Sequence, residues 1–245
     1  MTEGRGPLEG LLVADFSRVL AGPLTTMLLG DLGADVVKVE HPDGGDETRA
    51  WGPPFLGEDS TYYLAVNRNK RSVALDLGRD HGRRAALALA GRADVLVENF
   101  KAGALDRLGL GFEQVREGNP GLVWCSISGF GRGPGAGLPG YDFLVQASSG
   151  LMHITGQAGG EPTKVGVALV DVLTGLYALN GILAALHHRA RSGRGQLVEV
   201  SLLGAALASL VNQASSYLCT GRAPRAIGNR HPSIAPYETL MAADR

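Results

Sequence analysis

One carboxylate stands inside an otherwise apolar segment of the chain. Asp171 lies between Val170 and Val172, and the apolar segment continues as far as Leu186. An ionised carboxylate that is buried without partners is so unfavourable that it must be paired, neutralised or used in chemistry. Asp171 is therefore the first candidate for a reacting group.

Asp171 also has a structural explanation. The apolar segment contains no proline and predicts a long helix packed in the core, with Asp171 near its start. An aspartate at that position is favoured by the helix dipole and by free backbone N–H groups. The local sequence leaves both explanations open.

Short β-branched segments alternate with helical ones along the chain. The predicted strands cover residues 11–16, 35–40, 72–75, 94–99, 122–128 and 196–200, and the predicted helices between them cover 23–32, 79–90 and 112–117. This alternation is typical of βαβ units. We expect an α/β fold of the doubly wound type, with a mostly parallel sheet and helices on both faces.

Ligands of such sheets bind beyond the carboxyl ends of the strands. The loops expected there are 17–23, 41–46 and 99–103, and they offer backbone N–H groups, helix starts and cations. A glycine-rich segment at 129–137 follows another strand. Its continuing glycines and Pro134 favour a surface loop over a phosphate-binding turn.

Composition narrows the class of protein. The chain has 245 residues, 44% of them hydrophobic, and a net charge of −1, which provides no general attraction to nucleic acid or to a membrane. Cys125 and Cys219 match no metal-binding spacing, and we expect both to be buried, reduced thiols. With no apparent signal sequence, we expect a cytoplasmic protein without a metal site.

Taken together, several ordered segments resemble the family III coenzyme A transferases, the group of formyl-CoA transferase and carnitine CoA-transferase that also includes α-methylacyl-CoA racemase. The matching segments are Asp15 to Pro23, Leu32 to Glu40, Asn69 to Ser72, Val97 to Phe100, Gly140 to Asp142, Lys164 to Gly175 and Arg189 to Gln196.

The resemblance implies a domain organisation and a ligand. Residues 1–217 would form the Rossmann-like large domain that binds CoA and carries out catalysis. Residues 218–245 would form a linker and the beginning of a smaller domain, whose remainder is absent. The ligand would be a CoA thioester acting as substrate, with no permanently bound cofactor. Family members are interlocked dimers, so a homodimer is expected.

The resemblance also assigns roles to residues. Asp171 matches the nucleophilic aspartate of the family. Positions that contact CoA or the acyl group match Arg18, Val19, Leu20, Ala21, His41, Leu75, Asn99, Phe100, Arg107, Tyr141 and Asp142. Some of these have structural alternatives: Leu75 and Phe100 as core residues, Asn99 as a helix cap and Arg107 as a solvated side chain. Leu20 replaces a glutamine of formyl-CoA transferase, which predicts a less polar acyl pocket.

Three functions follow from this resemblance. A transferase would move CoA from an acyl-CoA donor to a carboxylic acid acceptor through an aspartyl-acyl anhydride on Asp171. A racemase would need a proton-shuttling histidine where this chain has Tyr141, and a phenol of ordinary pKa is a poor substitute at neutral pH. The third possibility is a CoA-binding fragment without activity, because family members continue well beyond this length.

Overall fold

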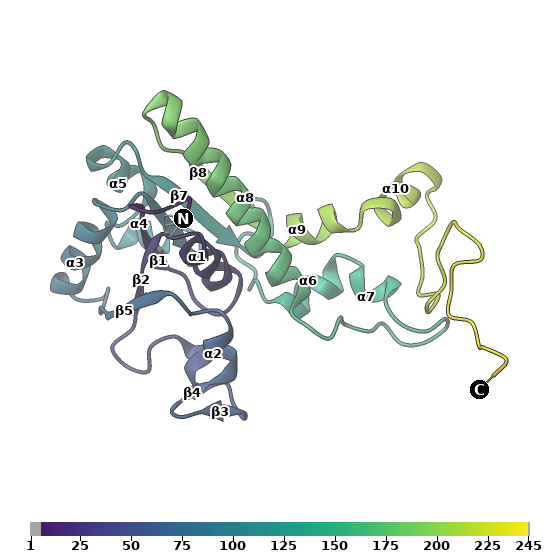
Figure 1. The fold of residues 1–245 in the computed structure, drawn as a ribbon. Helices are drawn as coiled ribbons and strands as arrows, with labels where there is room; N and C mark the ends of the chain where they lie inside the picture. The colour runs from purple at the N-terminus through teal and green to yellow at the C-terminus, as the bar shows by residue number, and fades with distance from the viewer. Residues whose placement is uncertain (1–5, 245) are drawn as a thin grey trace, which may run out of the picture.

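The computed structural model describes residues 6–244, which are built around a six-stranded sheet (Figure 1). All paired strands of this sheet run parallel, in the order β5-β2-β1-β6-β7-β8. The strands are β1 (Leu12–Phe16), β2 (Asp35–Glu40), β5 (Lys70–Ala74), β6 (Val95–Glu98), β7 (Val123–Ser128) and β8 (Leu197–Ser201). The doubly wound α/β fold expected from the sequence is confirmed.

Helices cover both faces of the sheet. One face is covered by α1 (Ala21–Asp31), α6 (Asp142–Ser148), α8 (Leu169–Ser192) and α9 (Leu202–Ser209). The other face is covered by α3 (Asp80–Ala90), α4 (Ala104–Arg107) and α5 (Phe112–Gly118). The four inner strands, β2, β1, β6 and β7, are therefore mostly buried, as parallel sheets require, whereas the edge strands β5 and β8 remain partly exposed.

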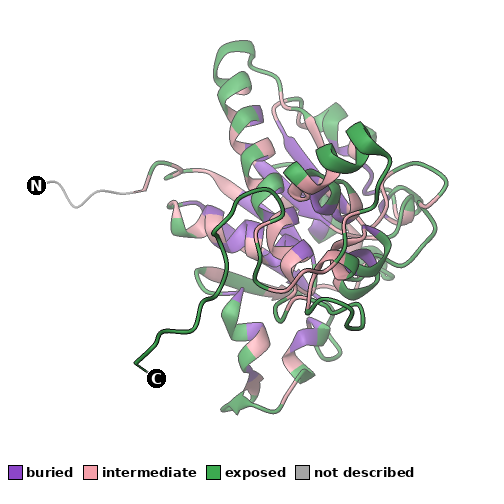
Figure 2. Ribbon diagram, turned by 90° about the vertical axis from the view of Figure 1, so that its right-hand side faces the viewer, coloured by how far each residue is buried: buried purple, intermediate pink, exposed green. Residues whose placement is uncertain are grey.

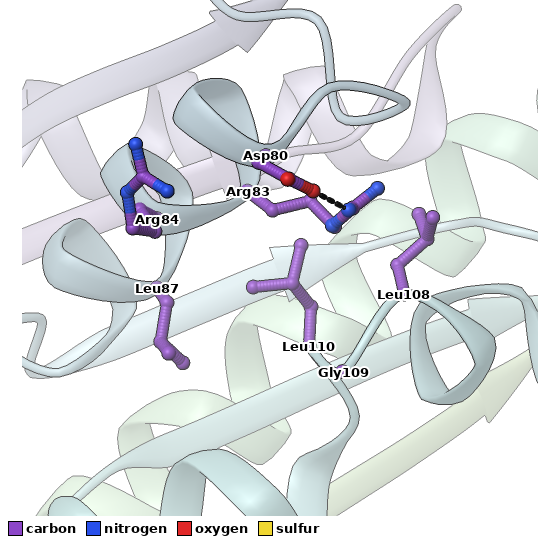
Figure 3. Close-up of a pocket in the computed structure, with 7 residues that line it drawn as sticks. All are labelled: Asp80, Arg83, Arg84, Leu87, Leu108, Gly109 and Leu110. Atoms are coloured by element: carbon purple, nitrogen blue, oxygen red, sulfur yellow. Dashed lines mark hydrogen bonds and ion pairs between the residues drawn. The ribbon is translucent and has the colours of Figure 1, made fainter.

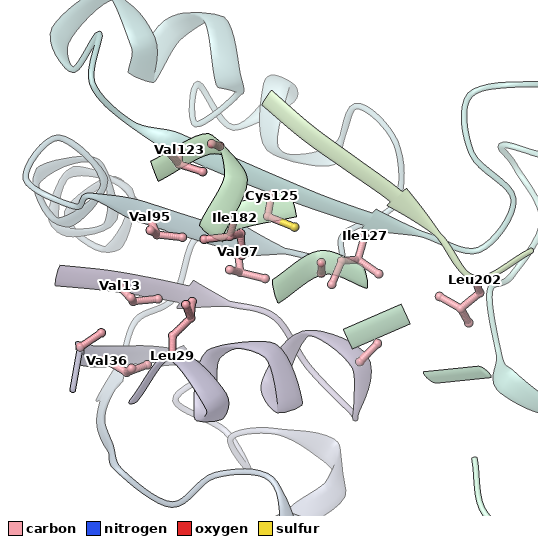
Figure 4. Packing of buried hydrophobic residues seen from close by; sticks show 14 of the residues in the cluster. Val13, Leu29, Val36, Val95, Val97, Val123, Cys125, Ile127, Ile182 and Leu202 are labelled. Atoms are coloured by element: carbon pink, nitrogen blue, oxygen red, sulfur yellow. The ribbon is translucent and has the colours of Figure 1, made fainter. Parts of the chain in front are cut away.

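The core follows the two-residue period of the strands. Val95 and Val97 face the α1 and α8 side, whereas Leu96 between them faces the α3 and α5 side. Figure 4 shows the first of these clusters, in which Ile182 of α8 and Leu29 of α1 meet the sheet valines. Complete burial of each such side chain contributes roughly 1.5–3 kcal/mol.

The long helix α8 is a core helix. Its length and composition alone would allow it to cross a membrane, but Val170, Ala178, Ile182 and Ala185 belong to the cluster on the sheet. Figure 1 shows α8 as the long green helix crossing the sheet. It begins at Leu169, so Asp171 lies in its first turn, as predicted.

Smaller elements connect this framework. After β2 come a 3₁₀ turn, η1 (Glu47–Ala50), the two-stranded hairpin β3 (Phe55–Leu56) and β4 (Asp59–Ser60), and α2 (Thr61–Ala65). α7 (Leu151–Ile154) follows α6, and α10 (Val211–Thr220) follows α9. None of these elements was predicted from the sequence.

The segment after α9 extends away from the sheet (Figures 1 and 2). α10 and the residues that follow it are mostly exposed, and they include large apolar side chains such as Leu218 and Met241. Cys219 lies here and is exposed, so the prediction that both cysteines are buried is wrong for this one. Cys219 lies in the last turn of α10, a helix in which no residue is buried, so its thiol remains accessible. Cys125 in β7 is buried as predicted.

Candidate active site

The first turn of α8 is capped by a side chain from another helix. Asp142, the first residue of α6, accepts hydrogen bonds through Oδ1 from the backbone N–H groups of Val170 and Asp171, at 2.8 and 3.2 Å. Its Oδ2 accepts a third bond of 2.6 Å from Nε2 of the buried Gln146. Asp142 thus satisfies two of the free donors at the start of α8 and fixes where that helix begins.

Asp171 itself carries the perturbed carboxyl group of the site. Burial, and secondly the negative charge of Asp142, raise the pKa of Asp171 to about 7. Within residues 6–244, no hydrogen-bond donor and no cation reaches its carboxylate oxygens. The ionised form is therefore poorly solvated and uncompensated, which suits a carboxylate that must attack an electrophile.

The start of α1 lies against the start of α8. Gly175, one turn after Asp171, packs so closely that an added Cβ would lie 2.9 Å from the carbonyl oxygen of Ala21. The Thr25 hydroxyl donates to the Gly175 carbonyl oxygen at 3.0 Å. This contact brings Leu20 and Ala21, at the end of the first loop, to the same side of the sheet as Asp171.

The first loop is joined to the loop after β6. Arg18 donates its backbone N–H to Oδ1 of Asn99 at 2.9 Å, and Nδ2 of Asn99 donates back to the Arg18 carbonyl oxygen at 2.7 Å. The Arg18 guanidinium lies 5.5 Å from the centre of the Phe100 ring. Three predicted ligand residues, Arg18, Asn99 and Phe100, are thus in mutual contact at the carboxyl edge of the sheet.

Other predicted residues lie along the same edge. His41 follows β2 and is exposed, and together with Arg18 it lines a small depression. Leu75 follows β5 and, like Phe100, packs against the second core cluster while remaining partly accessible. Arg107 ends α4 and is exposed.

Tyr141 stands next to Asp142 at the mouth of the site. The loop from β7 returns through a close contact of two glycines, Gly129 and Gly140, where a Cβ on either would approach the other's Cα to 2.4 Å. Without side chains at these two positions the chain can turn directly into α6. Tyr141 precedes that helix as its N-cap residue and is 57% exposed, so its ring faces solvent.

Two site residues were missed by the sequence analysis. Tyr62 of α2 is half-buried, and its pKa is raised to about 12 by burial and then by Asp171, Asp142 and Asp46. Its phenol is neutral at physiological pH, as that of an ordinary tyrosine also is, and it lies within the electrostatic field of Asp171. Asp46, which follows β2, is buried and receives the backbone N–H of Val19. Asp46 ends the loop 41–46 that was predicted at this edge of the sheet, but no pattern distinguished it from the other loop residues, and Tyr62 lies in a helix too short to be predicted.

A second surface depression lies elsewhere, between α3 and the connection from α4 to α5 (Figure 3). Arg83 is engaged there by Asp80, and Leu87, Leu108 and Leu110 form its apolar side. It contains none of the predicted site residues. Over residues 6–244 no cluster of three or more His, Cys, Asp or Glu side chains could hold a metal ion.

Comparison with known proteins gives the family. The family model described as CoA-transferase family III matches residues 8–245, which is nearly the whole chain. The chain belongs to CoA-transferase family III. The resemblance seen in the ordered segments of the sequence is thereby confirmed.

Individual members of CoA-transferase family III are similar over almost the full chain. The succinate–glutarate CoA-transferase of Agrobacterium fabrum is 49% identical over 251 residues, covering 100% of this chain and 63% of the relative. The human succinyl-CoA:glutarate CoA-transferase is 46% identical, covering 97% of this chain and 55% of the relative. The crystal structure of a CAIB/BAIF family protein from Brucella suis, 47% identical, superposes with a TM-score of 0.92 over 98% of this chain and 65% of that one. The chain thus spans 63% and 55% of the length of these two curated relatives.

Proposed function

We propose that the complete protein to which this chain belongs is an acyl-CoA:carboxylate CoA-transferase, with Asp171 as the covalent nucleophile. The observation that carries the proposal is the environment of Asp171, whose carboxylate is largely buried, pairs with no cationic side chain among residues 6–244, and has a pKa raised to about 7. Membership of CoA-transferase family III supports the reaction class.

The proposed reaction proceeds through acyl anhydrides. An oxygen of Asp171 attacks the carbonyl carbon of the donor thioester, the carbon–sulfur bond breaks, and CoA leaves as a thiolate. The acceptor carboxylate then attacks the aspartyl carbonyl carbon and expels the donor acid. Finally the thiolate attacks the acceptor's carbonyl carbon, which forms the product thioester and returns Asp171 as a carboxylate. Each anhydride intermediate is as reactive toward nucleophiles as a thioester, so the free energy of the donor's thioester bond is retained.

The neighbouring groups would assist in distinct ways. The phenol of Tyr62 is a neutral hydrogen-bond donor at physiological pH, and its raised pKa of about 12 extends that state to more alkaline pH. A neutral donor next to the reacting carbon can stabilise the oxyanion that develops there. Asp142 holds the first turn of α8 in place and so fixes the backbone from which Asp171 attacks.

For the substrates we propose a short dicarboxylyl-CoA donor and a dicarboxylate acceptor. The two relatives described above are named for succinate or succinyl-CoA together with glutarate. Leu20, in place of the polar residue of formyl-CoA transferase, is consistent with an acyl group that has a methylene next to the thioester. We further propose that the complete protein is a homodimer, which sedimentation velocity would test.

The decisive experiment traps the covalent intermediate. The complete protein is incubated with succinyl-CoA and hydroxylamine, and peptides covering residues 165–189 are analysed by mass spectrometry. We expect a hydroxamate on Asp171, and we expect glutaryl-CoA to form when glutarate replaces hydroxylamine. Asp171→Asn should abolish both products. Asp35→Asn, an exposed aspartate at the opposite edge of the sheet, should abolish neither.

The same preparation tests the racemase alternative. A racemase would exchange the α-hydrogen of a 2-methylacyl-CoA with deuterium from the solvent without any acceptor acid. We expect no such exchange, because Tyr141 occupies the position of the shuttling histidine and faces solvent. Exchange that depends on Asp171, together with no hydroxamate, would contradict the transferase proposal.

A further inference from the structure

The peptide groups of residues 17–19, here called the β1 loop, are held by side chains from outside the loop. Ser17 donates its N–H to Oδ1 of Asp15 at 3.0 Å, and its carbonyl oxygen accepts a bond of 2.8 Å from Nζ of Lys38. Asn99 holds both backbone groups of Arg18. The Val19 N–H is directed at the carboxylate of Asp46, at 3.3 Å from Oδ2 and 3.5 Å from Oδ1.

Val19 has a backbone conformation that its side chain disfavours. Its φ is +72°, in the left-handed region, where a β-branched residue is a genuine outlier. Such a residue costs on the order of 1–3 kcal/mol and persists only where its surroundings over-determine it. The hydrogen bond to Asp46 is the described interaction that acts on the Val19 N–H directly.

Asp46 is itself held rigidly. Its Oδ2 lies 2.9 Å from Nζ of Lys38, and the side chains of both residues are at most 1% exposed. Its Oδ1 accepts from the backbone N–H and the hydroxyl of Thr48, at 3.0 and 2.8 Å. Lys38 therefore bridges Asp46 and Ser17, so that one ammonium group ties both ends of the β1 loop to strand β2.

A buried ion pair of this kind is poor evidence for stability. Removing two charges from water costs several kcal/mol each, and well-packed apolar residues often serve the fold equally well. Lys38 lies in a segment that marked the family resemblance, yet it is buried behind the β1 loop and has no role in the proposed reaction. Packing alone does not explain a buried lysine behind the β1 loop.

We propose that Asp46, oriented by Lys38, is a positioning residue that holds Val19 in its left-handed conformation and thereby fixes the start of α1 beside Asp171. This positioning role rests on the proposed function when it is tested by the rate of CoA transfer. The β1 loop leads directly into Leu20 and Ala21, and Ala21 packs against α8 one turn from Asp171. A loop that relaxed would shift this edge of the acyl site, and a displacement of about 1 Å can cost on the order of 100-fold in rate.

The test compares two double variants of the complete protein that differ only in the acceptor at residue 46. K38M/D46N removes both charges but keeps an amide oxygen for the Val19 N–H. K38M/D46L removes both charges and the acceptor. We expect kcat for CoA transfer to be about 10-fold or more lower in K38M/D46L than in K38M/D46N, with the KM for donor thioester within about 3-fold.

A readout independent of activity separates this proposal from the proposed function. Hydrogen–deuterium exchange of the peptide covering the β1 loop should be about 10-fold faster in K38M/D46L than in K38M/D46N. That contrast is expected even if the wild-type protein transfers no CoA, in which case only the proposed function fails. Equal exchange and equal kcat in two folded variants would overturn the positioning role. If K38M/D46L does not fold, K38M/D46A replaces it with the same expectations.

Discussion

Ionisation of Asp171 should destabilise the fold at neutral and alkaline pH. Burial and the charge of Asp142 raise the pKa of this carboxyl group from 3.8 to about 7. A group whose pKa is higher in the folded state binds its proton more tightly there, so its contribution to stability is lost as pH rises through that folded value. Asp171→Asn, which removes the ionisation, should therefore stabilise the protein increasingly between about pH 4 and about pH 8.

The size of the change in unfolding free energy follows from the pKa shift of Asp171. A difference of roughly 3 pKa units corresponds to about 4 kcal/mol at 1.36 kcal/mol per unit. We expect the gain in unfolding free energy of Asp171→Asn over wild type to rise by up to about 4 kcal/mol and to level off above about pH 8. The same substitution should abolish transfer, as is typical where a site is strained for chemistry.

Urea denaturation at a series of pH values, at one protein concentration, measures this difference. Asp35→Asn serves as the control, because Asp35 is exposed and its side chain pairs only with the exposed Arg71. Its stability difference from wild type should vary little with pH over this range. A gain for Asp171→Asn that is independent of pH, or a loss at alkaline pH, would refute the assignment of a buried, uncompensated carboxylate.

Three further outcomes are expected. Asp142→Ala should lower the unfolding free energy by about 1–2 kcal/mol in urea titrations and Asp142→Asn by less, since the amide oxygen still caps α8; an equal loss in both would exclude the capping role. Lys70→Ala leaves the buried carboxylate of Asp15 without its 3.0 Å partner and should cost about 3–5 kcal/mol, whereas Arg71→Ala, at an exposed pair, should cost much less. Iodoacetamide should modify Cys219 in the native protein and the buried cysteine only after unfolding, as peptide mass spectrometry would show.

The framework of the fold was predictable because its sequence signals are periodic and local. All six predicted strands are present, with boundaries that shift by a few residues at most, and α1, α3 and α5 lie where helices were expected. Of the short helices, α5 was predicted, whereas α2, α6 and α7 were missed because four to seven residues cover at most two turns and show no clear 3.6-residue period. The exposure of Cys219 was not predicted, because the residue type alone does not show that its helix, α10, buries none of its residues.

The location of the site residues was also predictable from the sequence, whereas their side-chain contacts were not. Residues directly after strands, such as Arg18, His41 and Asn99, gather at one edge because parallel strands end together, and matching them to the family needed no coordinates. What the side chains do there could not be predicted. Asn99, expected to contact CoA, uses its amide to hold the backbone of Arg18. It therefore shapes the loop, whatever it contacts in the liganded state.

Asp46 and Tyr62 come from the irregular segment between β2 and β5, and a few long-range contacts place that segment. Arg49 lies 2.8 Å from Glu40 at the end of β2, and the Tyr63 hydroxyl donates to Oε1 of the same Glu40 at 3.1 Å. Because the segment is anchored at those two points, Asp46 is brought beneath the β1 loop and Tyr62 into the field of Asp171. Arg49 is no more than an isolated charge in the sequence. Its partners are fixed only once β2 has taken its place beside β1, so the residues that complete the site depend on the fold that precedes them.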